Sequence, residues 1–289
     1  MSMRLLLCTD LDRTVLPNGP QPESDGARSR FAALAARPEV TLVYVTGRDR
    51  QLVCEAMANY SLPGPDYVIG DVGTTIYEVR SNDWHPWPEW QQKIAPDWAG
   101  LGRSDLGKLL LDIVDLSRQE PAKQNLHKLS FYVPLHADTD TLSHDIRQRL
   151  EACGVRANLV WSIDEPREIG VLDVLPAGAG KKNAISFLMQ RNDFTLADTV
   201  FAGDSGNDLP VLVSEIPAVL VANASPEVRL EALAQASERG HADALYIAQG
   251  GLMDMNGNYT AGVLEGVVHY RPEIRDWLTG VTATVPANG

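Results

Sequence analysis

The stretch Leu5-Leu-Leu-Cys-Thr-Asp-Leu-Asp-Arg-Thr14 decides the fold class of this chain. Its apolar run, Leu5 to Cys8, is too short for a typical helix and is typical of a strand buried on both faces of a parallel sheet. Asp10 and Asp12 follow at the carboxyl end of this strand. Because residues i and i+2 of an extended segment point to the same side, we expect the two carboxylates to project together, with Cα atoms about 7 Å apart. Two carboxylates so placed can work on opposite sides of one small electrophile.

A second acidic pair lies almost two hundred residues further along the chain. Residues 202–208, Ala-Gly-Asp-Ser-Gly-Asn-Asp, follow another short apolar strand and place Asp204 and Asp208 four residues apart, one turn of a helix. If the two strands are neighbours, the acidic groups converge. Crowded carboxylates raise one another's pKa unless a cation joins them, and oxygen ligands of this kind select Mg²⁺. The sequence therefore predicts a magnesium site from four residues, namely Asp10, Asp12, Asp204 and Asp208.

Strands and helices alternate along the first and last parts of the chain. Residues 40–45 and 67–69 have the pattern of buried strands, and residues 52–60 and 181–189 have a helical period. This alternation is typical of an α/β fold with a doubly wound, Rossmann-like parallel sheet and helices on both faces.

The rhythm changes between residues 81 and 169, where we expect an α+β insertion. Here a strand at 127–134, an amphipathic helix at 139–153 and strands at 159–163 and 169–174 follow one another without regular alternation. Residues 1–80 and 170–289 are then the core. The start of the insertion holds four of the six tryptophans, which either pack in its interior or stack on a sugar ring: Trp84, Trp87, Trp90 and Trp98.

Composition limits the partners of this protein. The 289 residues carry a net charge of −13, which argues against nucleic acid, because binding to a phosphate backbone needs clustered Lys and Arg. Three separated cysteines and the lack of a signal peptide or a membrane-length apolar run lead us to expect a reduced, cytoplasmic protein that binds no membrane. The charge balance favours a small substrate whose phosphate is met by a few placed cations and a metal.

Two further segments offer phosphate contacts. Thr46-Gly47-Arg48 closes a strand, where a hydroxyl and free backbone N–H groups can hold phosphate oxygens. The segment around Lys181 resembles a P-loop superficially, but Leu175 stands where the first glycine is needed and Lys182 where Ser or Thr is needed. The histidines lack zinc-binding spacing, so a zinc site is not expected.

Taken together, these segments resemble the haloacid dehalogenase superfamily of phosphohydrolases from residue 4 to about residue 270. The four motifs of that superfamily occur in order as Asp10-Leu-Asp12-Arg-Thr14, Thr46-Gly47-Arg48, Lys181 and Gly203-Asp204-Ser-Gly-Asn207-Asp208. Within it, the chain most resembles sucrose-phosphate phosphatases and related sugar-phosphate phosphatases. Five segments carry that narrower likeness: residues 43–48, 66–77, 127–132, 172–181 and 260–269.

The resemblance implies a Mg²⁺-dependent phosphatase that hydrolyses sucrose 6-phosphate. It implies that Asp10 becomes an aspartyl-phosphate and that Asp12 protonates the departing sugar and then activates water. It places Mg²⁺ on Asp10, the carbonyl of Asp12, Asp204 and, directly or through water, Asp208. It further implies that the insertion is a cap that closes over the site and reads the sugar. The expected substrate-binding residues are Thr46, Gly47, Arg48, Lys128, Lys181 and Asn207.

Several alternatives stay open at this point. Other substrates are glucosylglycerol phosphate, mannosyl- or glucosyl-3-phosphoglycerate, trehalose 6-phosphate and small hexose phosphates, and a phosphomutase or a non-catalytic regulatory partner of a sugar-phosphate synthase is less well supported. Lys128 is either a sugar contact or an edge-strand charge facing water. Arg13 stands where glycine is frequent in the superfamily, so we expect its side chain to point away from the phosphate pocket. The protein is expected to be a monomer.

Overall fold

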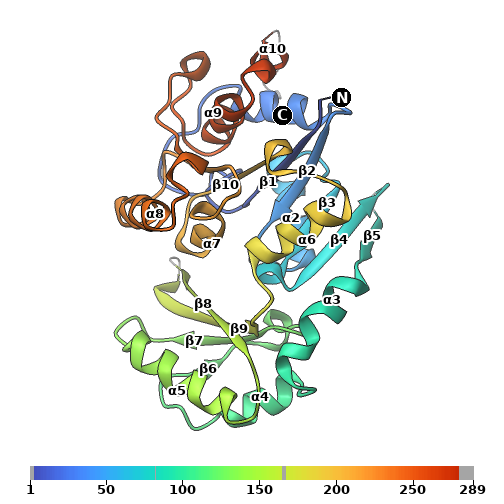
Figure 1. Cartoon of the computed structure of the whole chain (residues 1–289). Coiled ribbons are helices and arrows are strands. Elements are labelled where there is room, and N and C mark those ends of the chain that lie inside the picture. The colour runs from blue at the N-terminus through green and yellow to red at the C-terminus, as the bar shows by residue number, and fades with distance from the viewer. Residues whose placement is uncertain (1–2, 82, 165–166, 280–289) are drawn as a thin grey trace.

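The computed structural model describes residues 3–81, 83–164 and 167–279, and these form an α/β fold with a second, smaller sheet (Figure 1). Strand β1 (Leu5–Thr9) lies inside an eight-stranded sheet, with β2 (Val40–Val45) and β10 (Thr199–Gly203) as its parallel neighbours. The strand order is β12-β11-β10-β1-β2-β3-β4-β5. The other strands are β3 (Tyr67–Gly70), β4 (Thr75–Arg80), β5 (Asp83–Pro86), β11 (Ala218–Leu220) and β12 (Leu245–Ile247).

Alternate residues of β1 serve the two faces of this sheet. Leu5 and Leu7 pack in one buried cluster with α1 (Ala27–Ala35), α2 (Arg50–Tyr60) and α9 (Thr260–Tyr270). Leu6 and Cys8 pack in the opposite cluster. That second face is covered by α3 (Pro88–Ile94), α6 (Lys181–Arg191), α7 (Leu209–Leu212) and α8 (Pro226–Glu238). The predicted strand buried on both faces is confirmed, and it places Asp10 at the centre of the sheet edge.

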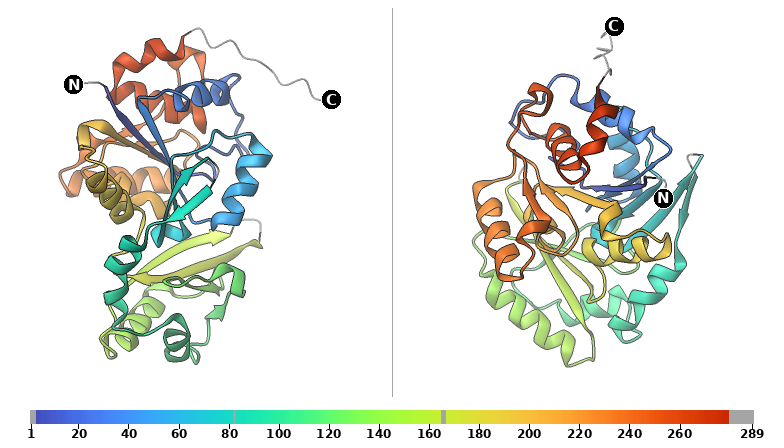
Figure 2. Two further views of the ribbon diagram at one scale, coloured as in Figure 1. Left: turned by 90° about the vertical axis from the view of Figure 1, so that its right-hand side faces the viewer. Right: turned by 45° about the horizontal axis from the view of Figure 1, so that its top comes forward.

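The smaller sheet is antiparallel, with the order β6-β7-β9-β8, and lies at one end of the molecule (Figure 2). Its strands are β6 (Ser117–Arg118), β7 (Leu129–Val133), β8 (Ala157–Asp164) and β9 (Ile169–Pro176). Helices α4 (Arg103–Leu109) and α5 (Thr139–Glu151) cover one face and bury a third cluster that runs from Trp98 to Val174. The α+β character expected for the insertion is present.

The boundaries of the insertion differ from the expected residues 81–169. Strand β5 was expected in the insertion, but it continues the hairpin of β4 and extends the eight-stranded sheet. Helix α3 likewise buries Trp90 and Ile94 in the core cluster of that sheet. At the other end, β9 was expected partly in the core, but it pairs with β7 and β8 as far as Pro176.

Short elements complete the chain. Helix α10 (Arg275–Leu278) follows α9, and single 3₁₀ turns lie at Asp71–Gly73, Ala95–Trp98, Pro121–Lys123, Leu196–Asp198, Gly206–Asp208, Ala242–Ala244, Leu252–Asp254 and Pro272–Ile274. In the described ranges, no helix combines the length and hydropathy that a membrane crossing requires.

Candidate active site

Three carboxylates meet where β1 and β10 end. These parallel strands are neighbours, and the N–H of Asp10 donates to the carbonyl of Ala202 at 2.9 Å, so both acidic segments leave the sheet together. Ligand oxygens of Asp10, Asp204 and Asp208 lie within 4.8 Å of one another, and all three residues are buried. The predicted convergence of the two acidic pairs is present for these three.

The tight turn after β10 is built around the carboxylate of Asp208. Its Oδ2 accepts backbone N–H groups from Asp204 and Ser205, each at 3.1 Å. The turn requires glycine at position 203, since a Cβ there would lie 2.5 Å from Cγ of Asp208. The sequence Gly-Asp-Ser-Gly-Asn-Asp thus aims its two aspartates at the sheet edge through local hydrogen bonds.

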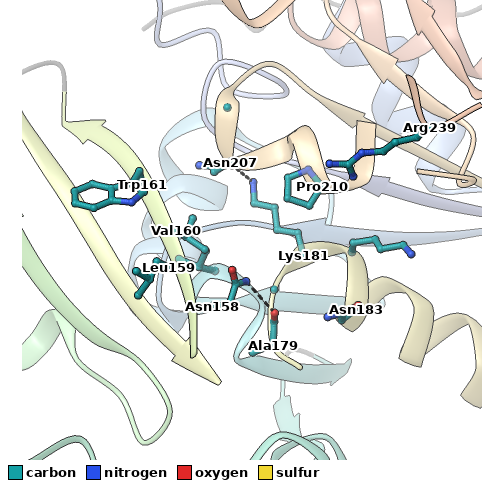
Figure 3. A pocket seen from close by; sticks show the side chains of 14 residues that line it. Asn158, Leu159, Val160, Trp161, Ala179, Lys181, Asn183, Asn207, Pro210 and Arg239 are labelled. Carbon is teal, nitrogen blue, oxygen red and sulfur yellow. Dashed lines mark hydrogen bonds between the residues drawn. The ribbon is translucent and has the colours of Figure 1, made fainter. Parts of the chain in front are cut away.

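Lys181 joins the acidic groups from the opposite side. It is the first residue of α6, and its Nζ donates to Oδ1 of Asp10 at 3.0 Å, to Oδ1 of Asp208 at 2.7 Å and to Oδ1 of Asn207 at 2.6 Å. Figure 3 shows this side chain reaching toward Asn207. The next residue, Lys182, pairs with Glu215 at 3.2 Å instead of joining the carboxylate cluster.

The charges of this cluster do not balance. Burial, with Asp208 and Asp204 nearby, raises the pKa of Asp10 well above its usual value, although Lys181 opposes the shift. Burial and the proximity of Asp208 raise the pKa of Asp204 to about 7. Burial alone would lower the pKa of Lys181, but Asp10 and Asp208 raise it, so this side chain stays cationic. Three buried acids facing a single buried ammonium suit a divalent cation with oxygen ligands.

Arg13 is placed differently from expectation. Instead of turning away from the phosphate site, it brings Nε to 3.6 Å from Oδ2 of Asp204. The negative excess at the carboxylate cluster accounts for this orientation. The backbone of Arg13 has a left-handed φ of 56°, which fits a position where glycine is frequent.

Asp12 lies apart from the three clustered acids. Its carboxylate accepts two hydrogen bonds from Arg48 and one from Asn18, whose Nδ2 lies 2.8 Å from Oδ1. Burial would raise the pKa of Asp12, but these partners, above all Arg48, hold it below its usual value. In the described part of the chain, the Asp12 side chain does not belong to the group of potential metal ligands. The role of its carbonyl as a ligand remains a prediction.

The segment after β2 completes the sheet edge. Thr46 is buried, and its hydroxyl accepts the N–H of Arg48 at 3.2 Å, which leaves the hydroxyl proton available to a phosphate oxygen. Gly47 faces Val72, with 3.7 Å between an added Cβ and Cγ2 of Val72. Arg48 donates to the carboxylate of Asp12, and its contact with substrate stays a prediction.

Lys128 was expected inside a strand, but it immediately precedes β7, in an isolated bridge with Asn125. It does not face water as an edge charge would, because only 6% of its surface is exposed. Its Nζ lies 3.8 Å from Oδ1 of Asp71, in the turn between β3 and β4. Asp71 was not among the predicted site residues, although it follows a strand of the core sheet and lies in the segment 66–77 that carries the family likeness.

A pocket of about 420 Å³ lies between β8 and the start of α6 (Figure 3). Its wall includes Lys181, Asn207, Trp161 and Arg239, but not Asp10 or Asp12. The indole N–H of Trp161 donates to the hydroxyl of Ser143 at 3.1 Å.

The four tryptophans at the start of the expected insertion, Trp84, Trp87, Trp90 and Trp98, do not line this pocket. Trp90 and Trp98 are fully buried, Trp84 contacts Tyr77, and Trp87 contacts Tyr67 and Phe187. These contacts favour packing over sugar stacking.

This fold, with an aspartate pair after the first strand, a lysine at a helix start and an acidic turn after the neighbouring strand, defines a haloacid dehalogenase-type phosphoric monoester hydrolase. The model of the sucrose-6F-phosphate phosphohydrolase family matches residues 3–271. The chain therefore belongs to that family.

Individual relatives agree with this placement. An HAD-like hydrolase of Nitrosococcus oceani is 52% identical over 96% of this chain and 75% of its own length. Sucrose-phosphatase 1 of Nicotiana tabacum is 31% identical over 78% of this chain, and the match spans 52% of the tobacco protein. A sucrose-phosphatase from Synechocystis, solved with sucrose and phosphate, aligns with a TM-score of 0.75 at 24% identity, over 93% of this chain and 98% of that one. The structural similarity to the Synechocystis protein shows that the two chains share a fold.

Proposed function

We propose that this protein is a Mg²⁺-dependent phosphatase that hydrolyses sucrose 6-phosphate. The observation that carries the proposal is the position of Asp10 at the sheet edge. Lys181 donates to the carboxylate of Asp10, whose ligand oxygen lies within 4.8 Å of those of Asp204 and Asp208. A nucleophilic carboxylate, a fixed cation and a metal-binding group are the parts that phosphoryl transfer needs.

In the proposed reaction, an oxygen of Asp10 attacks phosphorus and the bond to the sugar oxygen breaks, which gives an aspartyl-phosphate. Asp12 supplies the proton to the departing sugar oxygen and then removes a proton from the water that hydrolyses the intermediate. Lys181 and Thr46 bind phosphate oxygens, and Asn207 orients Lys181 through its 2.6 Å hydrogen bond. Mg²⁺ on Asp10, Asp204 and Asp208 would neutralise charge and hold the phosphate in line.

The choice of sucrose 6-phosphate rests on the family and on the named activity of the tobacco relative. We assign sugar recognition to the second sheet, acting as a cap, with Lys128 as one contact. The other glycosyl phosphates named above remain alternatives because their recognition depends on the same region. A non-catalytic role is less well supported, since Lys181 and the three clustered acids keep a geometry suited to chemistry.

The test is phosphate release from a panel of phosphorylated sugars, with Mg²⁺ and with EDTA. The panel contains sucrose 6-phosphate, trehalose 6-phosphate, glucosylglycerol phosphate, mannosyl-3-phosphoglycerate and glucose 6-phosphate. We expect metal-dependent release, fastest from sucrose 6-phosphate, and a loss of roughly 10⁴-fold or more in Asp10→Asn, whose amide cannot form the acyl phosphate. Release that persists in EDTA, or Asp10→Asn activity within tenfold of wild type, would contradict the proposal.

A further inference from the structure

The ammonium group of Lys128 is an unusual feature of the junction between the two sheets. The side chain is 7% exposed, and among the described residues Nζ makes no hydrogen bond to the protein. Nζ is not one of the described polar atoms that are both fully enclosed and without a hydrogen bond, so the tip of the side chain remains accessible to a ligand. A largely buried ammonium that makes an ion pair but no hydrogen bond to the described residues is suited to bind a ligand with hydrogen-bond acceptors.

Asp71 provides the complementary group from the core. Its Oδ1 lies 3.8 Å from Nζ of Lys128, which is too long for a hydrogen bond, and its Oδ2 accepts the hydroxyl of Thr75 at 3.2 Å. Burial raises the pKa of Asp71 above its usual value, although Lys128 acts to lower it. The side-chain amide of Asn125 and the hydroxyl of Thr75 also act to lower this pKa, so the carboxylate already draws on polar neighbours and would gain from further hydroxyl donors.

The backbone at Asp71 is strained and firmly held. Asp71 and Val72 have left-handed φ values of 51° and 59°, which are unfavourable for an aspartate and more so for a β-branched valine. Their N–H groups donate to the carbonyls of Arg48 at 2.9 Å and Thr46 at 3.1 Å. The same loop after β2 thus carries the predicted phosphate contact and fixes Asp71.

We infer that Asp71 and Lys128 form a subsite for the hydroxyl groups of the sugar that leaves from phosphorus, with Asp71 accepting from adjacent hydroxyls and Lys128 donating to a ring or hydroxyl oxygen. This inference rests on the proposed function for the identity of the substrate. It adds Asp71 as a specificity-determining residue, and it explains why a core loop and the second sheet present opposite charges without closing a hydrogen bond.

The location favours the leaving sugar over the phosphate. Arg48 binds the carboxylate of Asp12, the proposed proton donor to the sugar oxygen, and its own carbonyl holds Asp71. The leaving group must lie beside Asp12, and the chain of contacts from Asp12 through Arg48 leads to Asp71. The 420 Å³ pocket has both Lys181 and Val72, the neighbour of Asp71, in its wall, but neither catalytic aspartate.

The test measures binding without turnover. In an Asp10→Asn background, calorimetry determines the Kd of sucrose 6-phosphate and of inorganic phosphate, each with Asp71→Asn or Lys128→Met added. We expect each added change to weaken sucrose 6-phosphate by on the order of tenfold relative to phosphate, as for the loss of a hydrogen bond to a charged group. Asp112→Asn, at an exposed ion pair with Arg149, is the matched control and should alter neither Kd.

A structural ion pair predicts a different pattern. In that case Asp71→Asn and Lys128→Met lower the melting temperature and leave the ratio of the two Kd values within twofold of the background. That result would overturn the inference, as would sucrose 6-phosphate binding no tighter than phosphate before either change. Because Asp10→Asn binds without reacting, these outcomes are separate from any failure of wild-type turnover, which would reject the proposed function alone.

Discussion

Arg48 and Asp12 form a two-point ion pair in which Nε donates to Oδ2 at 2.8 Å and Nη2 donates to Oδ1 at 2.6 Å. The pair favours ionised Asp12, the form that activates water in the second half of the proposed reaction. The first half needs the protonated form. Arg48 must therefore loosen its contact with Asp12 before the sugar departs, and the two half-reactions place opposite demands on one contact.

Arg48→Ala should raise the pKa of Asp12, because it removes the hydrogen bonds that lower it. The proton donor then stays protonated to higher pH, so the alkaline limb of kcat/KM for sucrose 6-phosphate should move upward. The alkaline limb of kcat/KM for p-nitrophenyl phosphate should stay where it is, because that leaving group needs no proton. Arg50→Ala, two residues further along the chain, is the control, because it removes a guanidinium that lies over the Trp84 ring. A limb that stays fixed or moves downward would refute the assignment.

Asp12→Asn should lower kcat on sucrose 6-phosphate by roughly 10² to 10⁴-fold, the usual contribution of a general acid–base group. The rate of aspartyl-phosphate formation, measured from the burst phase, should fall less on p-nitrophenyl phosphate. Rapid-quench kinetics on both substrates provide the measurement. Equal losses in the burst phase for the two substrates would argue against a role in protonating the leaving group.

The acidic cluster predicts a pH-dependent stability in the absence of metal. The folded pKa of Asp204 is raised from 3.8 to about 7, so between these values the folded chain holds a proton that the unfolded chain releases. Stability in EDTA should therefore fall as pH rises through this window. Thermal melting between about pH 5 and about pH 8 should show the decline in wild type and a shallower one in Asp204→Asn. Added Mg²⁺ should raise the melting temperature of wild type most at the alkaline end of this pH range. If the melting temperatures of the two proteins changed with pH in parallel, the pKa of Asp204 would not be raised by its surroundings in the folded protein.

Much of the site could be predicted because short strands bring their carboxyl ends to one edge. Asp10, Asp204 and Asp208 are each placed by local sequence, and their meeting needs only β1 beside β10. Lys181 reaches them from the start of α6, which packs on the same sheet. The hairpin of β4 and β5 was missed because its residues continue a sheet at its edge, where one face is half exposed and the periodic signal is weak.

The contacts of the second sheet could not be predicted in the same way. Lys128 meets Asp71 across two chain segments, and the meeting depends on a left-handed turn at Val72 that its residue type disfavours. The orientation of Arg13 depends on a charge excess that exists only after the acidic residues have come together. Such features follow from tertiary structure and have no local signature.

The most direct test of the account is the specificity of the purified enzyme in Mg²⁺, measured as kcat/KM on sucrose 6-phosphate, glucose 6-phosphate and p-nitrophenyl phosphate. Binding energy from the remote sugar ring should help to align the phosphate, so small phosphates should lose kcat as well as affinity. We predict that sucrose 6-phosphate exceeds both others at least tenfold, a difference of about 1.4 kcal/mol or more, and that EDTA abolishes all three activities. Equal values for the three substrates, or turnover that survives EDTA, would contradict it.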